Sequence, residues 1–213
     1  MIYVTNLIPS LVEGLMTTLK IFIVTLALSL PLGVIIALGR LSKIKVIKRI
    51  TQGYVWIMRG TPLLLQIVFI FFGLPIIGIT FERFPAALLA FVLNYGAYFG
   101  EIFRAGIESI DKGQYEASEV LGMSNTQTFF RIVLPQMIKR VLPPVSNEVI
   151  TLIKDTALVY VVGLDELLRV AKIASNRDAS LVPLVVVAVF YLLLTAILTK
   201  VFQMLEKKYS YYL

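Results

Sequence analysis

Long apolar segments recur along this chain, separated by short polar links, and this pattern restricts the fold more than any other feature. With 58% hydrophobic residues and a mean hydropathy of +0.87, a soluble domain would have to leave most of its apolar surface in water. A membrane-spanning helix needs roughly 20 residues, so a chain of 213 residues has room for about five spans. We therefore expect a single all-α transmembrane domain over residues 1–213.

The apolar segments predict five membrane helices, near residues 15–39, 54–79, 84–106, 129–164 and 181–205. In the second segment, Arg59-Gly60-Thr61-Pro62 predicts a helix start, with Thr61 as N-cap and Pro62 at the first helical position. In the fourth segment, Pro143 and Pro144 lack backbone N–H donors, so we expect regular helical bonding to break there.

Basic residues are distributed unevenly between the two sides of the membrane that this topology defines. If the N-terminus lies outside, the cytoplasmic parts hold 14 Lys and Arg residues and the external parts hold four. Because cytoplasmic loops are enriched in Lys and Arg, we expect the N-terminus outside and the C-terminus in the cytoplasm. The net charge of +7 then reflects basic cytoplasmic loops and not a nucleic-acid partner.

Several kinds of chemistry are excluded by composition. The chain has no cysteine and no histidine, so it has no disulfides, no His/Cys zinc site and no thiol nucleophile. It also lacks the G-x-x-x-x-G-K-[ST] phosphate-binding loop. We expect no metal site or cofactor, and no ATP binding through a loop of this type.

A polar stretch between the third and fourth segments predicts a short cytoplasmic helix over residues 114–122. Ala117, Val120 and Leu121 form an apolar stripe at helical spacing, and Gly122 is suited to end the helix. Ser124 and Gln127 have the spacing of a capping box that starts the next helix. A short amphipathic helix of this kind fits a groove on a partner protein. An ordinary linker lying on the membrane surface explains the periodicity equally well.

The spacing of this stretch is specific. It has Glu116-Ala117-Ser118, then three residues, Gly122, nine residues, and Ile132-Val133-Leu134-Pro135. This pattern resembles the EAA signature of the membrane subunits of ATP-binding-cassette (ABC) importers, with Ser118 where the family usually has a second alanine. Segments between Arg59 and Thr156 are similar to the polar amino acid branch of that family: Arg59-Gly60-Thr61-Pro62-Leu63-Leu64, Glu101-Ile102-Phe103-Arg104, Leu134-Pro135-Gln136 and Leu152-Ile153-Lys154-Asp155-Thr156.

The resemblance implies a type I ABC importer permease core with a cytoplasmic coupling helix, in a bacterial inner membrane. It implies a second permease subunit, identical or paralogous, an external solute-binding protein, and ATP-binding subunits that hold ATP and Mg²⁺ and perform the hydrolysis. The permease itself is then a transporter subunit and not an enzyme. The residues it implies for contact with the ATPase are Gly113, Gln114, Glu116, Ala117, Ser118, Leu121 and Gly122.

Polar residues within the apolar segments are candidates for substrate binding, because an ionisable group at membrane depth costs roughly 2.5–3.5 kcal/mol on insertion scales. One group shares a face of the third segment and the other follows Pro143-Pro144 in the fourth. Broken helices with free backbone groups are how transporters build polar sites. The predicted substrate-binding residues are Asn94, Tyr98, Asn147, Glu148 and Thr151.

Glu148 indicates a cationic amino acid such as arginine, lysine or histidine, because no cation in the sequence is an obvious partner for it; glutamine is the other candidate. Pairing with Lys20, or protonation, would explain Glu148 equally well. Asp155 and Lys154 are more simply explained by pairing across helices, and Glu101 with Arg104 by a local ion pair at i, i+3.

Two other functions were weighed. An ion-coupled secondary amino-acid transporter would use Glu148 or Asp155 for coupling, but it normally has more helices and an internal repeat. An intramembrane hydrolase would need a carboxylate pair or a Ser–Lys dyad at one depth. ATP-dependent uptake that survives collapse of ion gradients would separate the importer from the secondary transporter.

Overall fold

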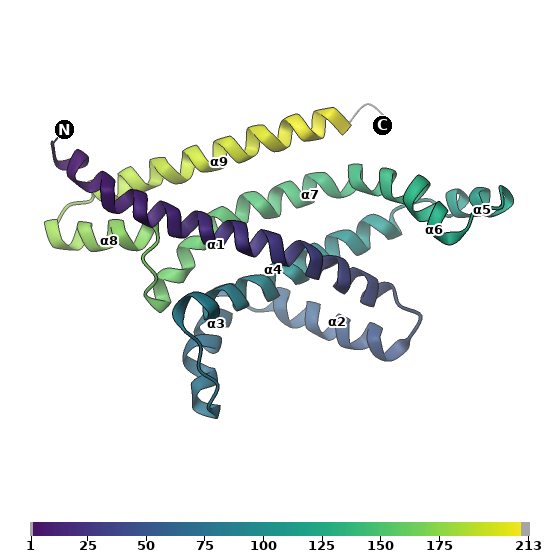
Figure 1. Cartoon of the computed structure of the whole chain (residues 1–213), viewed down its shortest axis with the longest axis horizontal. Coiled ribbons are helices and arrows are strands. Elements are labelled where there is room, and N and C mark those ends of the chain that lie inside the picture. The colour runs from purple at the N-terminus through teal and green to yellow at the C-terminus, as the bar shows by residue number, and fades with distance from the viewer. Residues whose placement is uncertain (1, 210–213) are drawn as a thin grey trace.

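The computed structural model describes residues 2–209, and every element formed by these residues is helical (Figure 1). Met1 and residues 210–213, the ends of the expected domain, lie outside the described residues. The α-helices are α1 (Ile2–Leu41), α2 (Lys45–Gly60), α3 (Leu63–Val68), α4 (Arg83–Glu108), α5 (Lys112–Val120), α6 (Asn125–Thr128), α7 (Leu134–Asp155), α8 (Leu167–Asp178) and α9 (Val182–Tyr209). Short π or 3₁₀ segments are η1 (Phe69–Gly73), η2 (Leu74–Ile77), η3 (Phe129–Val133) and η4 (Thr156–Val162).

Helices α1 and α4 cross closely at the centre of the molecule because glycines face the contact. A Cβ added to Gly33 of α1 would lie 2.7 Å from Cβ of Phe99, and one added to Gly100 of α4 would lie 2.7 Å from Cγ2 of Ile36. Small residues allow such approach between membrane helices. The main core lies on the other faces of α4, where Phe91, Tyr95 and Phe99 are buried.

The second expected segment is two helices and not one. Helix α2 starts at Lys45 and ends at Gly60, and the run from Leu63 to Ile77 leaves it at an angle of 105°. Figure 1 shows α3 and the following segments pointing away from the bundle. Thr61 is not the N-cap of the new helix, which begins at Leu63 after Pro62. The Thr61 hydroxyl donates instead to the carbonyl of Ile57, 2.8 Å away.

The expected break at Pro143 and Pro144 is absent, since α7 is helical from Leu134 to Asp155. Proline removes one donor from the helix but holds a helical φ, so the flanking turns keep the helix intact here. With η3 before it and η4 after it, α7 accounts for most of the expected segment 129–164.

Helix α8 was not anticipated. Its N-cap is Glu166, whose fully buried carboxylate accepts the N–H groups of Leu168 and Arg169 at 2.7 Å each. Tyr191 of α9 donates to the same carboxylate at 3.1 Å. The first helix begins earlier than expected, and its Leu7 and Leu11 are buried against α8 and α9. Glu166 therefore ties α8 to α9, in a region where α1 packs against both helices.

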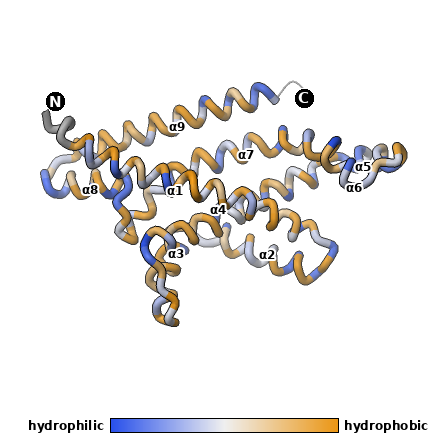
Figure 2. The backbone as a smooth tube through the Cα atoms, in the orientation of Figure 1, coloured by the Kyte–Doolittle hydropathy of each residue, from blue (hydrophilic) through white to orange (hydrophobic). Residues whose placement is uncertain are grey.

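Length and hydropathy identify three described helices as candidate membrane spans, α1, α4 and α9, or four if the bent pair of α2 and α3 counts as one. Figure 2 shows apolar residues along most of α1 and α9. Helix α7 is long enough, at 22 residues or about 33 Å, but it carries Lys139, Arg140, Glu148, Lys154 and Asp155. The expected count of five is therefore not reached by apolar character alone, because one segment is lined with charge.

Candidate functional site

A cavity of about 620 Å³ opens between the α2–α3 bend, α4, α7 and η4. Three separate parts of the sequence form its walls. Its lining residues are Arg59, Gly60, Thr61, Pro62, Leu63, Leu64, Asn94, Tyr95, Tyr98, Glu148, Thr151, Asp155 and Leu158. The cavity thus combines two carboxylates, one guanidinium, two phenols and an amide in one concave site, which is the composition expected of a site for a small polar ligand.

Four of the five residues predicted for substrate binding line this cavity: Asn94, Tyr98, Glu148 and Thr151. Glu148 and Thr151 are one turn apart on α7, and Asn94 and Tyr98 are one turn apart on α4. Asn147 is exposed and is not among the lining residues. Adjacent helix positions diverge by about 100°, so Glu148 and Asn147 face different directions. The roles of all five in binding remain predictions.

Three lining residues were missed by the sequence reasoning: Arg59, Tyr95 and Asp155. The Tyr95 hydroxyl donates to Oδ2 of Asp155 at 2.7 Å, so the cross-helix partner expected for Asp155 is a phenol. Asp155 lies seven residues after Glu148, which places both carboxylates on one face of α7, about 10 Å apart along its axis. That spacing was visible in the sequence and could have predicted Asp155 as a lining residue.

Lys20 is not the partner of Glu148. Its Nζ lies over the ring of Phe84, 4.8 Å from the centroid. In the described part of the chain, no cation lies within ion-pair distance of Glu148. The positive charge of Arg59 does act on Glu148 through space.

Asn94 has a structural task that the sequence did not reveal. Pro62 has no N–H, so the carbonyl of Met58 four residues earlier lacks its helical donor. The side-chain amides of Asn94 and Gln66 both donate to this carbonyl, at 2.9 Å each. Asn94 also donates to Oε1 of Gln66 at 3.1 Å. The bend that forms one wall of the cavity is therefore held by a buried amide of α4.

A second cavity of about 320 Å³ follows α4 and α7 toward α5 and shares Arg59, Tyr98 and Glu148 with the first. Beside it, Glu101 accepts from Nε of Arg104 at 3.0 Å, as the i, i+3 spacing predicted. Nη2 of Arg40 lies 3.5 Å from the same carboxylate, so Glu101 also joins α1 to α4.

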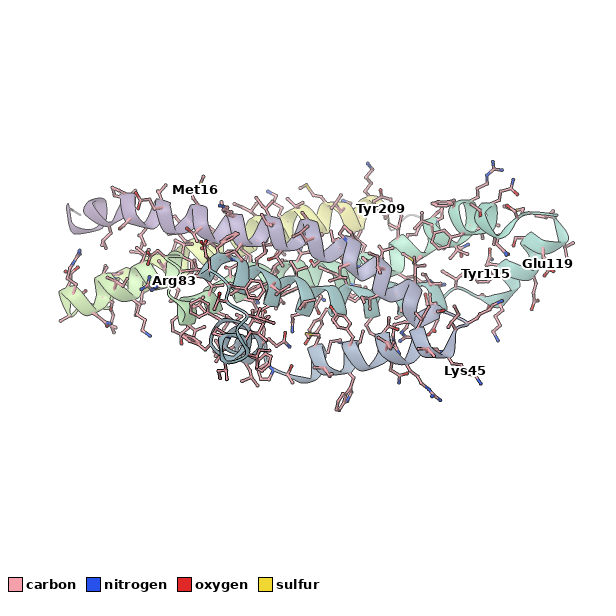
Figure 3. The ribbon with its side chains drawn as sticks, turned by 60° about the horizontal axis from the view of Figure 1, so that its bottom comes forward. Met16, Lys45, Arg83, Tyr115, Glu119 and Tyr209 are labelled. Carbon is pink, nitrogen blue, oxygen red and sulfur yellow. The ribbon has the colours of Figure 1, made fainter. Side chains whose placement is uncertain are left out.

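The polar stretch of the sequence forms α5 at one end of the molecule. Figure 3 shows Tyr115 and Glu119 beyond the ends of the other long helices. The side chain of Asp111 caps the helix by accepting the N–H of Gly113 at 2.7 Å. Gly122, with φ of +71°, follows the helix in the left-handed conformation that glycine adopts without strain. Ser124 and Gln127 form the predicted capping box.

Ser118 does not lie on the outer face of α5. It is buried, and its Oγ accepts the hydroxyl of Thr128 at 2.9 Å while donating to the carbonyl of Tyr115 at 2.7 Å. Ser118 therefore fastens α5 to α6. Burial raises the pKa of the Tyr115 phenol on the same helix.

The exposed part of α5 is its C-terminal end. Val120 is 88% exposed and Leu121 is 75% exposed, a high value for large apolar side chains outside the candidate spans. Gln114 is anchored behind them, because its Oε1 accepts the side-chain amide of Gln136 at 3.2 Å. Gly113, Glu116 and Ala117 are exposed as well. The apolar end of α5 is thus supported from within and uncovered outside.

Comparison with known families decides the class of protein. Residues 29–211 match the family described as the binding-protein-dependent transport system inner membrane component. The chain belongs to this family.

Two relatives are permeases for amino acids. The permease is 40% identical over 203 residues to the arginine transport system permease protein ArtQ of Bacillus subtilis, covering 94% of this chain and 93% of ArtQ. It is 39% identical over 206 residues to the L-cystine transport system permease protein TcyB of the same organism, covering 96% of this chain and 88% of TcyB. The permease is therefore a member of the amino-acid branch of ABC permeases, as its motifs indicated.

Solved structures give the same fold. A crystal structure of an amino acid ABC transporter with histidines contains a chain that is 34% identical, with a TM-score of 0.91 and coverage of 97% of both chains. The MetNI methionine ABC transporter shares the fold at 19% identity, with a TM-score of 0.76 and coverage of 94% of this chain and 96% of that chain. The permease thus has the all-α fold of a type I ABC importer permease and is a multi-pass inner membrane protein.

Proposed function

We propose that this chain is the subunit through which a polar amino acid, cationic in preference to glutamine, crosses the membrane. The observation that carries the proposal is the cavity, in which Glu148 and Asp155 face the same space and neither has an ion-pair partner within the described residues. Two carboxylates and one guanidinium give the lining a formal charge of about −1, which favours a ligand with one net positive charge. The arginine function in the name of ArtQ supports this preference.

The energy comes from a partner. We propose that an ATP-binding subunit, which holds ATP and Mg²⁺, docks at the exposed end of α5, and that its closure moves α4 and α7, the helices on either side of α5 and α6. The chain itself performs no chemistry. A second permease subunit and an external solute-binding protein complete the importer, as the family description implies.

We further propose that the N-terminus lies outside and the C-terminus in the cytoplasm. Figure 1 supports this topology, because the start of α1 and α8 lie at one end, while α5, α6 and the link between α1 and α2 lie at the other. The basic residues of that link, Lys43, Lys45 and Lys48, then lie on the same side as α5, as the positive-inside rule requires.

The test is uptake of arginine, with glutamine as comparator, into proteoliposomes that hold the permease with its ATP-binding subunit and solute-binding protein. We expect Glu148→Gln to reduce arginine uptake at least about tenfold, since one unpaired charge is worth roughly 1.4 kcal/mol or more, while ATP hydrolysis continues. Asn147→Gln is the matched control, because its side chain is the neighbour that lies outside the cavity, and it should transport normally.

Equal transport by wild type and Glu148→Gln would show that Glu148 is structural and that the solute-binding protein alone selects the substrate. Uptake that stops when ion gradients are collapsed, and continues without ATP, would instead support a secondary transporter.

A further inference from the structure

Arg59 is the cationic side chain of the cavity that the proposed function has not yet used. It lies in the last turn of α2, immediately before the bend, and it is exposed. Among the described lining residues it is the one basic side chain, beside two acidic ones. It also lines the second cavity, together with Tyr98 and Glu148.

The guanidinium of Arg59 is positioned but not neutralised. Its Cζ lies 5.1 Å from the centroid of the Tyr98 ring, which is a cation–π distance. Within the described chain, no carboxylate lies within 4 Å of it. Arg104, one α4 turn from Tyr98, is by contrast ion-paired with both Glu101 and Glu108. Stacking fixes the plane of Arg59 and leaves its N–H donors available to a ligand.

The chemistry of an amino acid matches this arrangement. Every amino acid carries an ammonium and a carboxylate on one carbon, so its binding site needs an acceptor and a donor close together. The charge of Arg59 acts directly on Glu148, which places the two opposite charges near each other. A guanidinium presents a rigid fork of donors that fits a carboxylate in bidentate fashion, which an ammonium cannot do.

We propose that Arg59 is the anchor for the α-carboxylate of the substrate, held in place by Tyr98, with Glu148 receiving the adjacent α-ammonium. This inference rests on the proposed function, since it assigns a role within the same cavity. Asp155, about 10 Å further along α7 and hydrogen-bonded to Tyr95, then receives a cationic group at the end of the substrate side chain. The two ends of the cavity thus read the two ends of the ligand.

A purely structural role for Arg59 makes a different prediction. A basic residue in the last turn of a helix stabilises the helix through its dipole. Loss of that effect would weaken binding of every ligand equally, whether or not the ligand carries a carboxylate.

The experiment compares binding of L-arginine with binding of agmatine, its decarboxylated form, to the complex of permease and ATP-binding subunit in nanodiscs, without the solute-binding protein. We expect wild type to bind arginine at least about tenfold more tightly than agmatine, the effect of a charge-assisted contact. Arg59→Gln should remove this preference while agmatine binding is retained or improved, because a like charge has been removed from its site. Arg59→Lys keeps the charge but not the fork, so it should keep part of the preference.

Arg140→Gln is the matched control. Arg140 lines the second cavity but not the first, and it donates to the carbonyl of Ser109. It should leave the ratio of the two affinities unchanged. Agmatine binding by Arg59→Gln also serves as the check that the variant is folded.

The outcomes separate the two proposals. If arginine binds and Glu148→Gln weakens it, but Arg59→Gln leaves the arginine-to-agmatine ratio as in wild type, the anchor assignment is overturned and the proposed function stands. If wild type does not distinguish the two ligands, the anchor assignment is overturned as well. If neither ligand binds wild type at any concentration tested, the cavity is not the substrate site and both proposals fail.

Discussion

The cavity and the α5 tip are built in opposite ways. The cavity takes its lining from residues 59–64, 94–98 and 148–158, which meet only because α2, α4 and α7 pack around one space. The tip, residues 111–128, is shaped by its own caps, one left-handed glycine and a hydroxyl pair 10 residues apart. A site assembled from distant segments can move when its helices move, whereas a locally braced helix can transmit a force as a unit. Each prediction below tests one side of this contrast.

The largest expected effect comes from the exposed end of the tip. Leu121→Asp places a charge where an apolar surface is offered to the partner, so ATP-driven uptake should fall at least about tenfold while thermal stability of the isolated permease is unchanged. Uptake assays on proteoliposomes and thermal melts of the permease in detergent measure the two quantities. Glu119→Gln, an exposed change on the same helix away from the apolar end, is the control. Normal uptake by Leu121→Asp would show that the partner docks elsewhere.

Removing the brace of the bend should destabilise the cavity. Asn94→Leu leaves the Met58 carbonyl with one of its two side-chain donors and removes the bond to Gln66, so we expect a loss of about 2 kcal/mol of stability. The midpoint of thermal unfolding reports the loss. Asn125→Leu, an exposed asparagine at the start of α6, should change the midpoint little. If both variants melt alike, the amide of Asn94 does not hold the bend.

The buried cap of α8 tests a third contact between distant segments. Glu166→Ala removes the acceptor of two backbone N–H groups and of the Tyr191 hydroxyl, and we expect a loss of about 1–2 kcal/mol. Glu166→Gln keeps an oxygen acceptor, so it should recover part of the stability. Equal melting of both variants would mean that the charge and not the capping geometry matters.

A smaller effect is expected at the glycine that ends α5. Gly122→Ala forces a side chain into φ of +71°, which costs about 1 kcal/mol. Because the strain is confined to the tip, hydrogen exchange should increase in α5 and α6 and remain unchanged in α4 and α7. Gly53→Ala, where an added Cβ meets nothing within 4 Å, is the control. Faster exchange throughout the bundle would contradict the independence of the tip.

The smallest effect is expected for Ser118→Ala, which loses the contact with Thr128. We expect a change of about 1 kcal/mol or less, since the serine hydroxyl can be replaced by a methyl group in a small space. Comparison with Thr128→Ala and the double variant in a mutant cycle measures the coupling. A coupling of zero would show that the two hydroxyls contribute independently.

Much of the tip could be predicted from the sequence because its determinants are local. Gly122, Ser124 and Gln127 act on backbone within three residues of themselves, and the structure confirms the turn and the capping box. The orientation of Ser118 could not be predicted, because it depends on where Thr128 lies after the turn. The sequence placed four of the predicted site residues correctly on two helices, but not the third wall, since a bend of 105° at Pro62 brings Arg59 to the cavity.

The sequence by itself determined that this protein is an all-helical membrane permease of the amino-acid ABC family, through its long apolar segments and the fixed spacing from Glu116 to Pro135. The tertiary structure alone decided which charges face one another. Arg59, Glu148 and Asp155 lie in one cavity, while Lys20 and Asn147 lie outside it. The physical reason is that periodicity fixes the face of a helix on which a residue lies, whereas only packing at glycines and the proline bend fixes what that face meets.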